Sequence, residues 1–419
     1  MATPLLSHKA FDDGNRSARG ELSPQVDIEI GLLTGGIDKH YALGLATALV
    51  SKGARIDVIG SDDVDSPELH VTPTLRFFNL RGTLQRNATL ARKVWRVLAY
   101  YFRLIHYAAY AKPKLFHILW NNKFQFFDRT LLMLYYRLLG KKIVLTAHNV
   151  NAGKRDSNDS ALNRLTLRIQ YRLSDHIFVH TEIMKRELLE SFGVPEQSIS
   201  IIPYGINDCV PDTDLSQTDA KKRLGIRSTD KTILFFGNIG PYKGLEFLVA
   251  AFDRIAAQNA NYRLIIAGKP RGDCEEYVVE IRRAIDRSPG AERIIQHIEY
   301  VRDEDTEVYF KAADLLVLPY RDIYQSGVLF LGYNFGLPVV ATDVGSLRVD
   351  IIEGRTGFLC KPCDAVHLAK IIEVYFESDL FKNLRSRRQE IRAYATAKHS
   401  WNTVGNLTRN VYAGLLLKH

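Results

Sequence analysis

Short apolar runs alternate with amphipathic stretches along the chain, and this alternation predicts the strands and helices of parallel sheets. The strand-like runs of the first half cover residues 26–33, 55–59, 115–119, 143–146 and 177–179. Those of the second half cover residues 232–236, 263–267, 315–318 and 339–342. Apolar residues with helical spacing follow the first run of each half, at 41–51 and 245–256. We therefore predict an α/β fold of two Rossmann-like, doubly wound parallel sheets that face each other across a cleft.

Composition divides the chain into five segments. Residues 1–25 are polar and are expected to be a disordered lead, and residues 26–206 and 231–399 are expected to form the two sheet domains. Between them, residues 207–230 are rich in Asp, Ser and Thr, which is typical of a linker. Residues 400–419 are expected to form a C-terminal helix, for which packing back onto the N-terminal domain is one option.

The chain of 419 residues has no apolar stretch of the roughly 18 residues that a membrane-spanning helix needs. Residues 1–25 also lack the apolar core of a secretory signal, so a cytoplasmic location is expected. Four cysteines are too few for a disulfide framework. Cys360 and Cys363 form one C-x-x-C pair without the second pair of a structural zinc site, so we expect two incidental thiols in a loop, with a redox role as the alternative.

The net charge of +9 is concentrated, because residues 69–127 contain no Asp or Glu. Basic residues there alternate with aromatic ones, as in Arg92, Lys93 and Arg96 around Trp95. A basic, aromatic helix favours an anionic membrane surface, and we expect that contact over residues 86–114. A solvated basic face with inward aromatic residues is the alternative. Nucleic acid is not expected, since no nucleic-acid motif accompanies the charge.

Two places in the first half are suited to contact a ligand. Gly35 and Gly36 follow the first strand, where small residues let the backbone approach a bound group, although a tight turn explains them equally well. His148 stands just beyond residues 143–146, at a strand's carboxyl end, where ligands of parallel sheets bind. A structural role for a lone histidine is the alternative.

Two places in the second half are suited to an anion. Lys243, in Gly-Pro-Tyr-Lys-Gly, precedes a core helix and could neutralise a phosphate, or could be a solvated loop lysine. Ser326 and Gly327 open a helix between two strands, where free backbone N–H groups suit a diphosphate. A plain N-cap role for Ser326 is the alternative.

These segments resemble the GT4-type, or group 1, glycosyltransferases. The resemblance covers roughly residues 26–400 and includes Gly35-Gly36 and Thr146–His148 in the acceptor half. It is strongest in the donor half, over residues 236–244, 312–320, 326–329, 336–345 and 354–359. It implies the GT-B fold and a retaining transfer from a nucleotide-diphosphate sugar, such as a UDP- or GDP-sugar, with no required metal.

The resemblance also assigns roles to residues. It implies that Lys243 and the N–H groups around Ser326, Gly327 and Val328 hold the donor diphosphate, beside Gly237 and Asn238. It implies that His148 contacts the donor sugar near the reacting carbon. Gly35 and Gly36 would let the phosphate and the acceptor approach the first loop.

The chain departs from the family pattern at two places. The family usually has an arginine at the position of Asn238 or Gly240, and Arg271 is one residue that could compensate. Its usual pair of donor-loop glutamates falls at Ile323 and Leu331. The first of these departures removes a charge-assisted contact worth ~1.5–3 kcal/mol.

The sequence thus predicts a cytoplasmic glycosyltransferase at the inner face of the cell membrane. Its product would be a bacterial surface polysaccharide or glycolipid, built on a glycan or lipid-linked acceptor. One alternative is a nucleotide-sugar epimerase on the same fold, which would want acid–base carboxylates in the cleft. The other is a GT-B subunit that has lost turnover and serves as a binding or partner scaffold.

Overall fold

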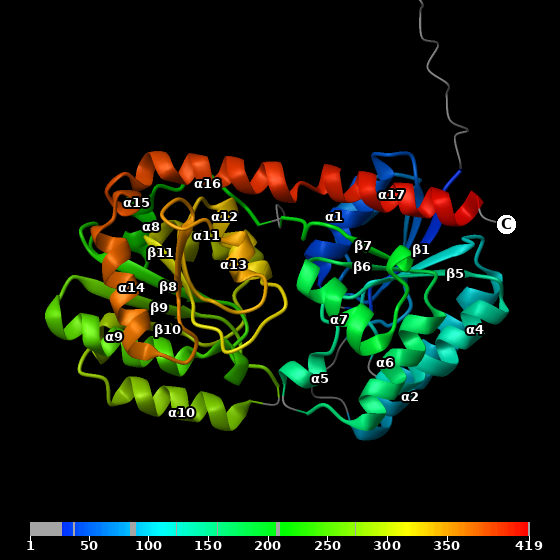
Figure 1. Cartoon of the computed structure of the whole chain (residues 1–419), viewed down its shortest axis with the longest axis horizontal. Coiled ribbons are helices and arrows are strands. Elements are labelled where there is room, and N and C mark those ends of the chain that lie inside the picture. Colours follow the sequence, from blue (N-terminus) through cyan, green and yellow to red (C-terminus); the bar gives the residue numbers. More distant parts are fainter. Residues whose placement is uncertain are drawn as a thin grey trace, which may run out of the picture.

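The computed structural model describes residues 27–36, 38–83, 89–122, 124–156, 158–206, 210–272 and 274–417. The predicted lead, residues 1–25, lies outside this range. Two sheets, each with helices around it, lie side by side along the long axis of the molecule (Figure 1). Every strand pairing in both sheets is parallel, which confirms the predicted α/β class.

The N-terminal sheet has seven strands. In spatial order they are β3 (Leu75–Asn79), β2 (Arg55–Gly60), β1 (Glu29–Leu33), β4 (Leu115–Ile118), β5 (Lys142–Thr146), β6 (His176–Val179) and β7 (Ile199–Ile201). Its helices are α1 (Lys39–Val50), α2 (Leu90–Tyr110), α3 (Gln125–Phe127), α4 (Met133–Leu138), α5 (Ala152–Arg155), α6 (Ala161–Leu173) and α7 (Glu182–Phe192). A π-helical turn, Asp128–Leu132, joins α3 to α4.

The C-terminal sheet has six strands. In spatial order they are β10 (Ile294–His297), β9 (Tyr262–Ala267), β8 (Lys231–Phe236), β11 (Leu315–Leu318), β12 (Val339–Thr342) and β13 (Gly357–Cys360). Its helices are α8 (Gln217–Arg223), α9 (Leu245–Gln258), α10 (Glu275–Asp286), α11 (Asp303–Ala312), α12 (Gly327–Asn334), α13 (Leu347–Asp350), α14 (Ala365–Glu377), α15 (Asp379–Lys382) and α16 (Leu384–His399).

The strand order reverses once in each sheet, between β1 and β4 and between β8 and β11. The central strands are buried along their length, because helices cover both faces of a parallel sheet. At such a reversal, the loops that follow the two neighbouring strands run toward opposite faces of the sheet. They therefore separate and form a crevice beyond the carboxyl ends of the strands. Both crevices should therefore hold ligand-binding loops.

The predicted linker, residues 207–230, differs from the observed arrangement in its second part. Residues Gln217–Arg223 form α8, and the Ser216 side chain caps it by accepting from Asp219 N. Lys221 is buried and forms an ion pair with Asp314 at 2.9 Å. In this segment, the polar residues that suggest a linker instead provide the cap of α8 and one partner of a buried ion pair in the C-terminal domain.

The last helix, α17 (Trp401–Leu417), crosses back over the N-terminal domain and packs on α1 (Figure 1). The approach is close, because a Cβ on Gly44 would lie 2.1 Å from the Trp401 ring. Trp401 also donates its indole N–H to Ile206 O at 2.7 Å. One continuous stretch, α16 followed by α17, thus ties the two domains together at the edge of the cleft.

Candidate active site in the interdomain cleft

A cavity of about 480 Å³ lies between the two domains. Its walls come from loops that follow the carboxyl ends of strands in both sheets. The N-terminal wall includes Asp38, Tyr41, Trp120, His148, Asn149, Arg155 and Tyr204. The C-terminal wall includes Asn238, Tyr242, Lys243, Gln325, Ser326, Gly327 and Val328. The position agrees with the crevice that both sheet reversals create.

His148 is held by hydrogen bonds that define which nitrogen carries its proton. His180 Nδ1 lies 3.1 Å from Ile202 O, and a carbonyl only accepts, so His180 Nδ1 is the donor. Burial lowers the pKa of His180 to about 4, so the ring is neutral and its Nε2 is an acceptor. His148 Nδ1, 3.0 Å away, must therefore donate to it. His148 Nε2 is left as a bare acceptor.

That Nε2 atom of His148 is buried and has no hydrogen-bond partner. Its ring stacks on Trp120 at 4.3 Å between centroids and meets Tyr41 edge-on at 4.6 Å. Burial first, and then the neighbouring His180, lower the pKa of His148 well below its ordinary value. A buried acceptor of this kind costs free energy unless a ligand donates to it. The geometry suits the hydroxyl of a neutral ligand.

Lys243 lies on the opposite wall, at the end of the 3₁₀ turn Pro241–Lys243. Gly244 then adopts φ 62°, and a Cβ there would meet Pro319 O at 2.1 Å, so glycine is required for this turn. The ammonium group lies 3.8 Å above the Tyr320 ring, and no carboxylate among the described residues pairs with it. Burial, and then the charge of Arg155, lower the pKa of Lys243 to about 7. An anion in the cavity would restore its charge.

Ser326 is the N-cap of α12 and also lines the cavity, while its part in binding an anion stays a prediction. Its Oγ accepts from Leu329 N at 3.4 Å and so caps α12, and the same residue lines the cavity with Gly327 and Val328. The start of α12 therefore borders the cavity on the same wall as Lys243, and a helix start is where free N–H groups can bind an anion. Tyr204 covers this helix start, since its hydroxyl would lie 3.2 Å from a Cβ on Gly327.

The other predicted residues are less central. Asn238 lines the cavity, whereas Gly237 lies behind it, beside Val328. Gly35 and Gly36 have φ of 61° and 72° and form a tight turn against Trp120 and Arg81.

Arg271 does not line the cavity either. Its Nη1 atom pairs with Asp156 at 3.3 Å, across the cleft from the strand loop that carries Arg271.

Several cavity residues carry no motif in the sequence. Trp120 and Tyr204 follow β4 and β7, and each is a single aromatic residue among many, so only the strand order reveals them. Asp38 caps α1 by accepting from Tyr41 N, and burial raises its pKa. Arg155 is a cation on the N-terminal wall, and its charge is one cause of the lowered pKa of Lys243. Strand-end position was the one signal that could have found most of these residues.

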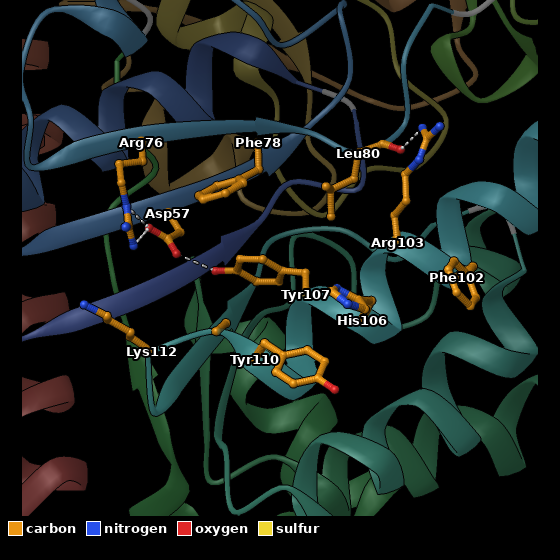
Figure 2. A pocket seen from close by; sticks show the side chains of 11 residues that line it. Asp57, Arg76, Phe78, Leu80, Phe102, Arg103, His106, Tyr107, Tyr110 and Lys112 are labelled. Atoms are coloured by element: carbon orange, nitrogen blue, oxygen red, sulfur yellow. Dashed lines mark hydrogen bonds and ion pairs between the residues drawn. The ribbon is translucent and has the colours of Figure 1, made fainter.

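A second cavity, of about 600 Å³, lies away from the cleft between α2 and the outer strands (Figure 2). Phe78, Phe102 and Tyr110 give it apolar walls, and Arg103 and Lys112 stand at its sides. At its floor, the Asp57 carboxylate is buried and is neutralised by Arg76 at 2.5 Å, while Tyr107 donates to it at 2.8 Å. The cavity is thus an apolar trough with cations around it.

Comparison with known proteins assigns the class. Residues 35–208 match the family model Glycosyltransferase Family 4, and residues 230–377 match Glycosyl transferases group 1. The two matches together cover most of the chain, which belongs to the GT4-type glycosyltransferase family. The predicted resemblance is therefore confirmed.

Named relatives agree with this assignment. An uncharacterized glycosyltransferase of Methanocaldococcus jannaschii is 26% identical over 244 residues, which are 57% of this chain and 60% of that protein. The D-inositol 3-phosphate glycosyltransferase of Corynebacterium aurimucosum is 24% identical over 281 residues, 65% of this chain and 66% of that one. The matched region thus spans less than two thirds of either relative.

Solved structures confirm the GT-B fold. Sucrose-phosphate synthase from Thermosynechococcus elongatus has a TM-score of 0.74 at 19% identity, covering 94% of this chain and 100% of that one. HepE from Anabaena, in complex with UDP-glucose, has a TM-score of 0.71 at 15% identity, covering 92% and 100%. At these identities the likeness concerns the fold.

Proposed function

We propose that this protein is a retaining glycosyltransferase that moves a sugar from a nucleotide-diphosphate sugar to a glycan or lipid-linked acceptor. The observation that carries the proposal is the pairing of two unlike features across one cavity. A buried, carboxylate-free Lys243 beside the start of α12 suits a diphosphate, and the bare Nε2 of His148 opposite suits a sugar hydroxyl.

The residues suggest how such a transfer would be assisted. As the bond from the sugar to the diphosphate breaks, negative charge grows on the leaving group. Lys243 and the N–H groups at Gly327 and Val328 stand where they would stabilise that charge, without reorganising during the reaction. His148, kept neutral, would accept from a sugar hydroxyl and hold the reacting carbon in place. These groups supply positive charge without a metal.

The donor proposal is UDP- or GDP-sugar. The GT-B enzyme HepE from Anabaena is described in complexes with UDP and with UDP-glucose. A direct test is release of nucleoside diphosphate from a panel of sugar nucleotides in the presence of membrane extract. The proposal is supported if the unchanged protein releases nucleoside diphosphate and forms a glycosylated product, and if Lys243→Ala loses this turnover. Binding of nucleotide without any turnover across the panel overturns it.

One observation favours the second candidate, a GT-B subunit without turnover that acts as a binding scaffold. Ile323 and Leu331, where the family usually has glutamates, both line the cavity, so they present apolar surface to the ligand. The epimerase alternative gains no support, because Asp38 is the one carboxylate among the described lining residues. The turnover assay separates these candidates.

We also propose that α2 rests on an anionic membrane surface at the inner face of the cell membrane. Along α2, Trp95 is 72% exposed, Phe102 72% and Tyr110 78%. Tyr100 and Tyr101 are buried, so the alternative of inward aromatic residues describes only part of the helix. No helix among the described residues is long and apolar enough to cross a membrane. Arg86 lies outside the described residues.

The surface test is sedimentation with liposomes. An interfacial helix inserts apolar side chains while each nearby basic residue contributes about 1 kcal/mol on an anionic surface. Changing Arg92, Lys93 and Arg96 to Glu should release the protein from anionic vesicles. In the matched control, three exposed basic residues at the end of α10 are changed to Glu, which should leave vesicle binding intact. These residues are Arg282, Arg283 and Arg287. Equal binding to neutral vesicles, or none to either kind, would rule the surface out.

A further inference from the structure

Arg155 brings a cation into the donor cavity from the N-terminal domain. It ends the short helix α5, its side chain is only 12% exposed, and it lines the cavity with Lys243 and Ser326. Neither Asn238 nor Gly240, where the family usually has an arginine, provides a charge on the other wall. Arg155 is therefore the candidate for the missing cation.

The guanidinium group of Arg155 is held in one orientation. Its Nε and Nη2 atoms donate to the two carboxylate oxygens of Asp156 at 2.8 and 3.0 Å, and Nη1 donates to Asn149 Oδ1 at 3.1 Å. Arginine has five N–H groups, so two remain beyond these three bonds. Because Asp156 accepts hydrogen bonds from Nε and Nη2 along one edge of the guanidinium group, the remaining N–H groups are oriented before any ligand binds.

Arg271 secures the other side of Asp156. Its Nη1 atom reaches the Oδ2 atom of Asp156 at 3.3 Å from the opposite domain. Burial alone would raise the pKa of Asp156, but hydrogen bonds and charges from Arg155 and Arg271 lower it below its ordinary value. The carboxylate therefore stays ionised and continues to orient Arg155 at any pH near neutrality.

Arg155 also reaches the C-terminal wall. Its guanidinium carbon lies 4.6 Å from the centre of the Tyr242 ring, and Tyr242 directly precedes Lys243 in the chain. The charge of Arg155 is one of the causes that lower the pKa of Lys243. Lys243 Nζ lies 5.3 Å from the centre of the same Tyr242 ring, and both cations line the cavity, so an anion bound there would relieve their repulsion.

We propose that Arg155 contacts the diphosphate of the donor and supplies, from across the cleft, the cation that positions 238 and 240 lack. The inference rests on the proposed function. Asp156 and Asn149 are positioning residues, which hold the fork toward the cavity. A diphosphate held by Lys243 on one side and by Arg155 on the other would add to the contacts that already link the two domains, Arg271 to Asp156 and Arg155 to Tyr242.

The test is calorimetric titration of the full chain with UDP, GDP and the matching nucleosides. Arg155→Ala should raise the Kd for the nucleoside diphosphate about tenfold or more, because a charge-assisted contact is lost, and leave nucleoside affinity unchanged. Arg155→Gln is shorter and uncharged but keeps a polar amide at the site, and should show the same loss if Arg155→Ala folds poorly. Arg164→Ala, an exposed arginine paired with Asp159 in the same domain, is the matched control.

The outcomes separate this inference from the proposed function. If Lys243→Ala weakens diphosphate binding while Arg155→Ala and Arg155→Gln bind normally, Arg155 does not contact the diphosphate, and the donor site stands without it. If the unchanged protein binds no nucleoside diphosphate, the proposed function and this inference both fail. An equal loss of diphosphate and nucleoside affinity in Arg155→Gln would show a structural role instead.

Discussion

The two walls of the cleft are built from opposite chemistry. The N-terminal wall centres on His148, which is neutral, stacked on Trp120 and stripped of a partner at Nε2. The C-terminal wall centres on Lys243, whose ammonium group is near its titration point, and on the start of α12, the positive end of the helix dipole. This difference is the basis of our proposal that the N-terminal wall orients neutral hydroxyl groups and that the C-terminal wall binds the charged diphosphate. Arg155 is the exception, since it is a cation on the neutral side.

This contrast also has an energetic side. On the C-terminal wall burial makes a cation less stable, so Lys243 lies near its titration point until an anion arrives. On the N-terminal wall burial keeps His148 and His180 uncharged, and the hydrogen-bond chain fixes one tautomer. The C-terminal wall is therefore expected to gain charge when an anion binds, and the N-terminal wall is expected to stay neutral.

The largest expected effect comes from removing the cation of the charged wall. Lys243→Ala should raise the Kd for the donor roughly 10- to 100-fold, because a charge-assisted contact worth ~1.5–3 kcal/mol is lost. The thermal midpoint should change far less, since an unpaired buried ammonium contributes little to the fold. Calorimetric titration with UDP and GDP measures the affinity. Unchanged affinity would show that the C-terminal wall does not bind the diphosphate.

The neutral wall should respond differently. His148→Ala is expected to lower turnover roughly 10- to 100-fold through loss of sugar positioning, with the nucleotide affinity nearly unchanged. Steady-state kinetics and titration on the same preparation give both numbers. If turnover stays near normal, His148 is a structural residue and the contrast between the walls loses its N-terminal half.

His180 tests whether the tautomer matters. His180→Phe removes the acceptor for His148 Nδ1–H, so the proton can move to Nε2 and block the acceptor in the cavity. Turnover should fall about tenfold. His180→Gln, which can both donate and accept, should restore most of it. Nitrogen-15 shifts of the His148 ring report the tautomer directly, and an unchanged tautomer in His180→Phe would remove this role.

The pH dependence of donor binding should follow Lys243. In the empty protein its pKa is about 7, and the diphosphate binds the ammonium form, so affinity should fall as pH rises. The sign follows because the complex holds one more proton than the empty site. Between pH 7 and 8 the Kd should rise about fivefold, with proton uptake. Lys243→Arg stays charged and should flatten the profile; a flat profile in the unchanged protein would contradict the shift.

The strands show what a sequence pattern can and cannot locate. The central strands Leu315–Leu318 and Val339–Thr342 were predicted residue for residue, because burial on both faces makes them apolar throughout. The edge strands β3, β7, β10 and β13 were missed. They mix polar and apolar residues, as in Leu-Arg-Phe-Phe-Asn of β3, because one side of an edge strand has no neighbour.

The two walls differ in the same way. Lys243 and Ser326 lie in contiguous motifs, so their places at the start of a helix follow from local order. Trp120 and His180 follow the separate strands β4 and β6, and both contact His148 only because β5 lies between these strands in the sheet. Roles that depend on a neighbour distant in sequence, such as the tautomer of His148, therefore needed the structure.

The smallest expected effect concerns Asn238→Arg, which tests whether Arg155 already supplies the second cation of the donor site. Asn238→Arg restores a cation where the family usually has one, and Asn238 already lines the cavity, so donor affinity should stay unchanged or improve about twofold. The gain is small if Arg155 already supplies the second charge. In an Arg155→Ala background the same substitution should recover most of the lost affinity. Gly240→Arg is the neighbouring comparison, although its Cβ would lie 3.3 Å from Arg271 Cδ. A fall in binding for Asn238→Arg alone would mean that the donor loop is arranged differently and that the two walls do not share the diphosphate.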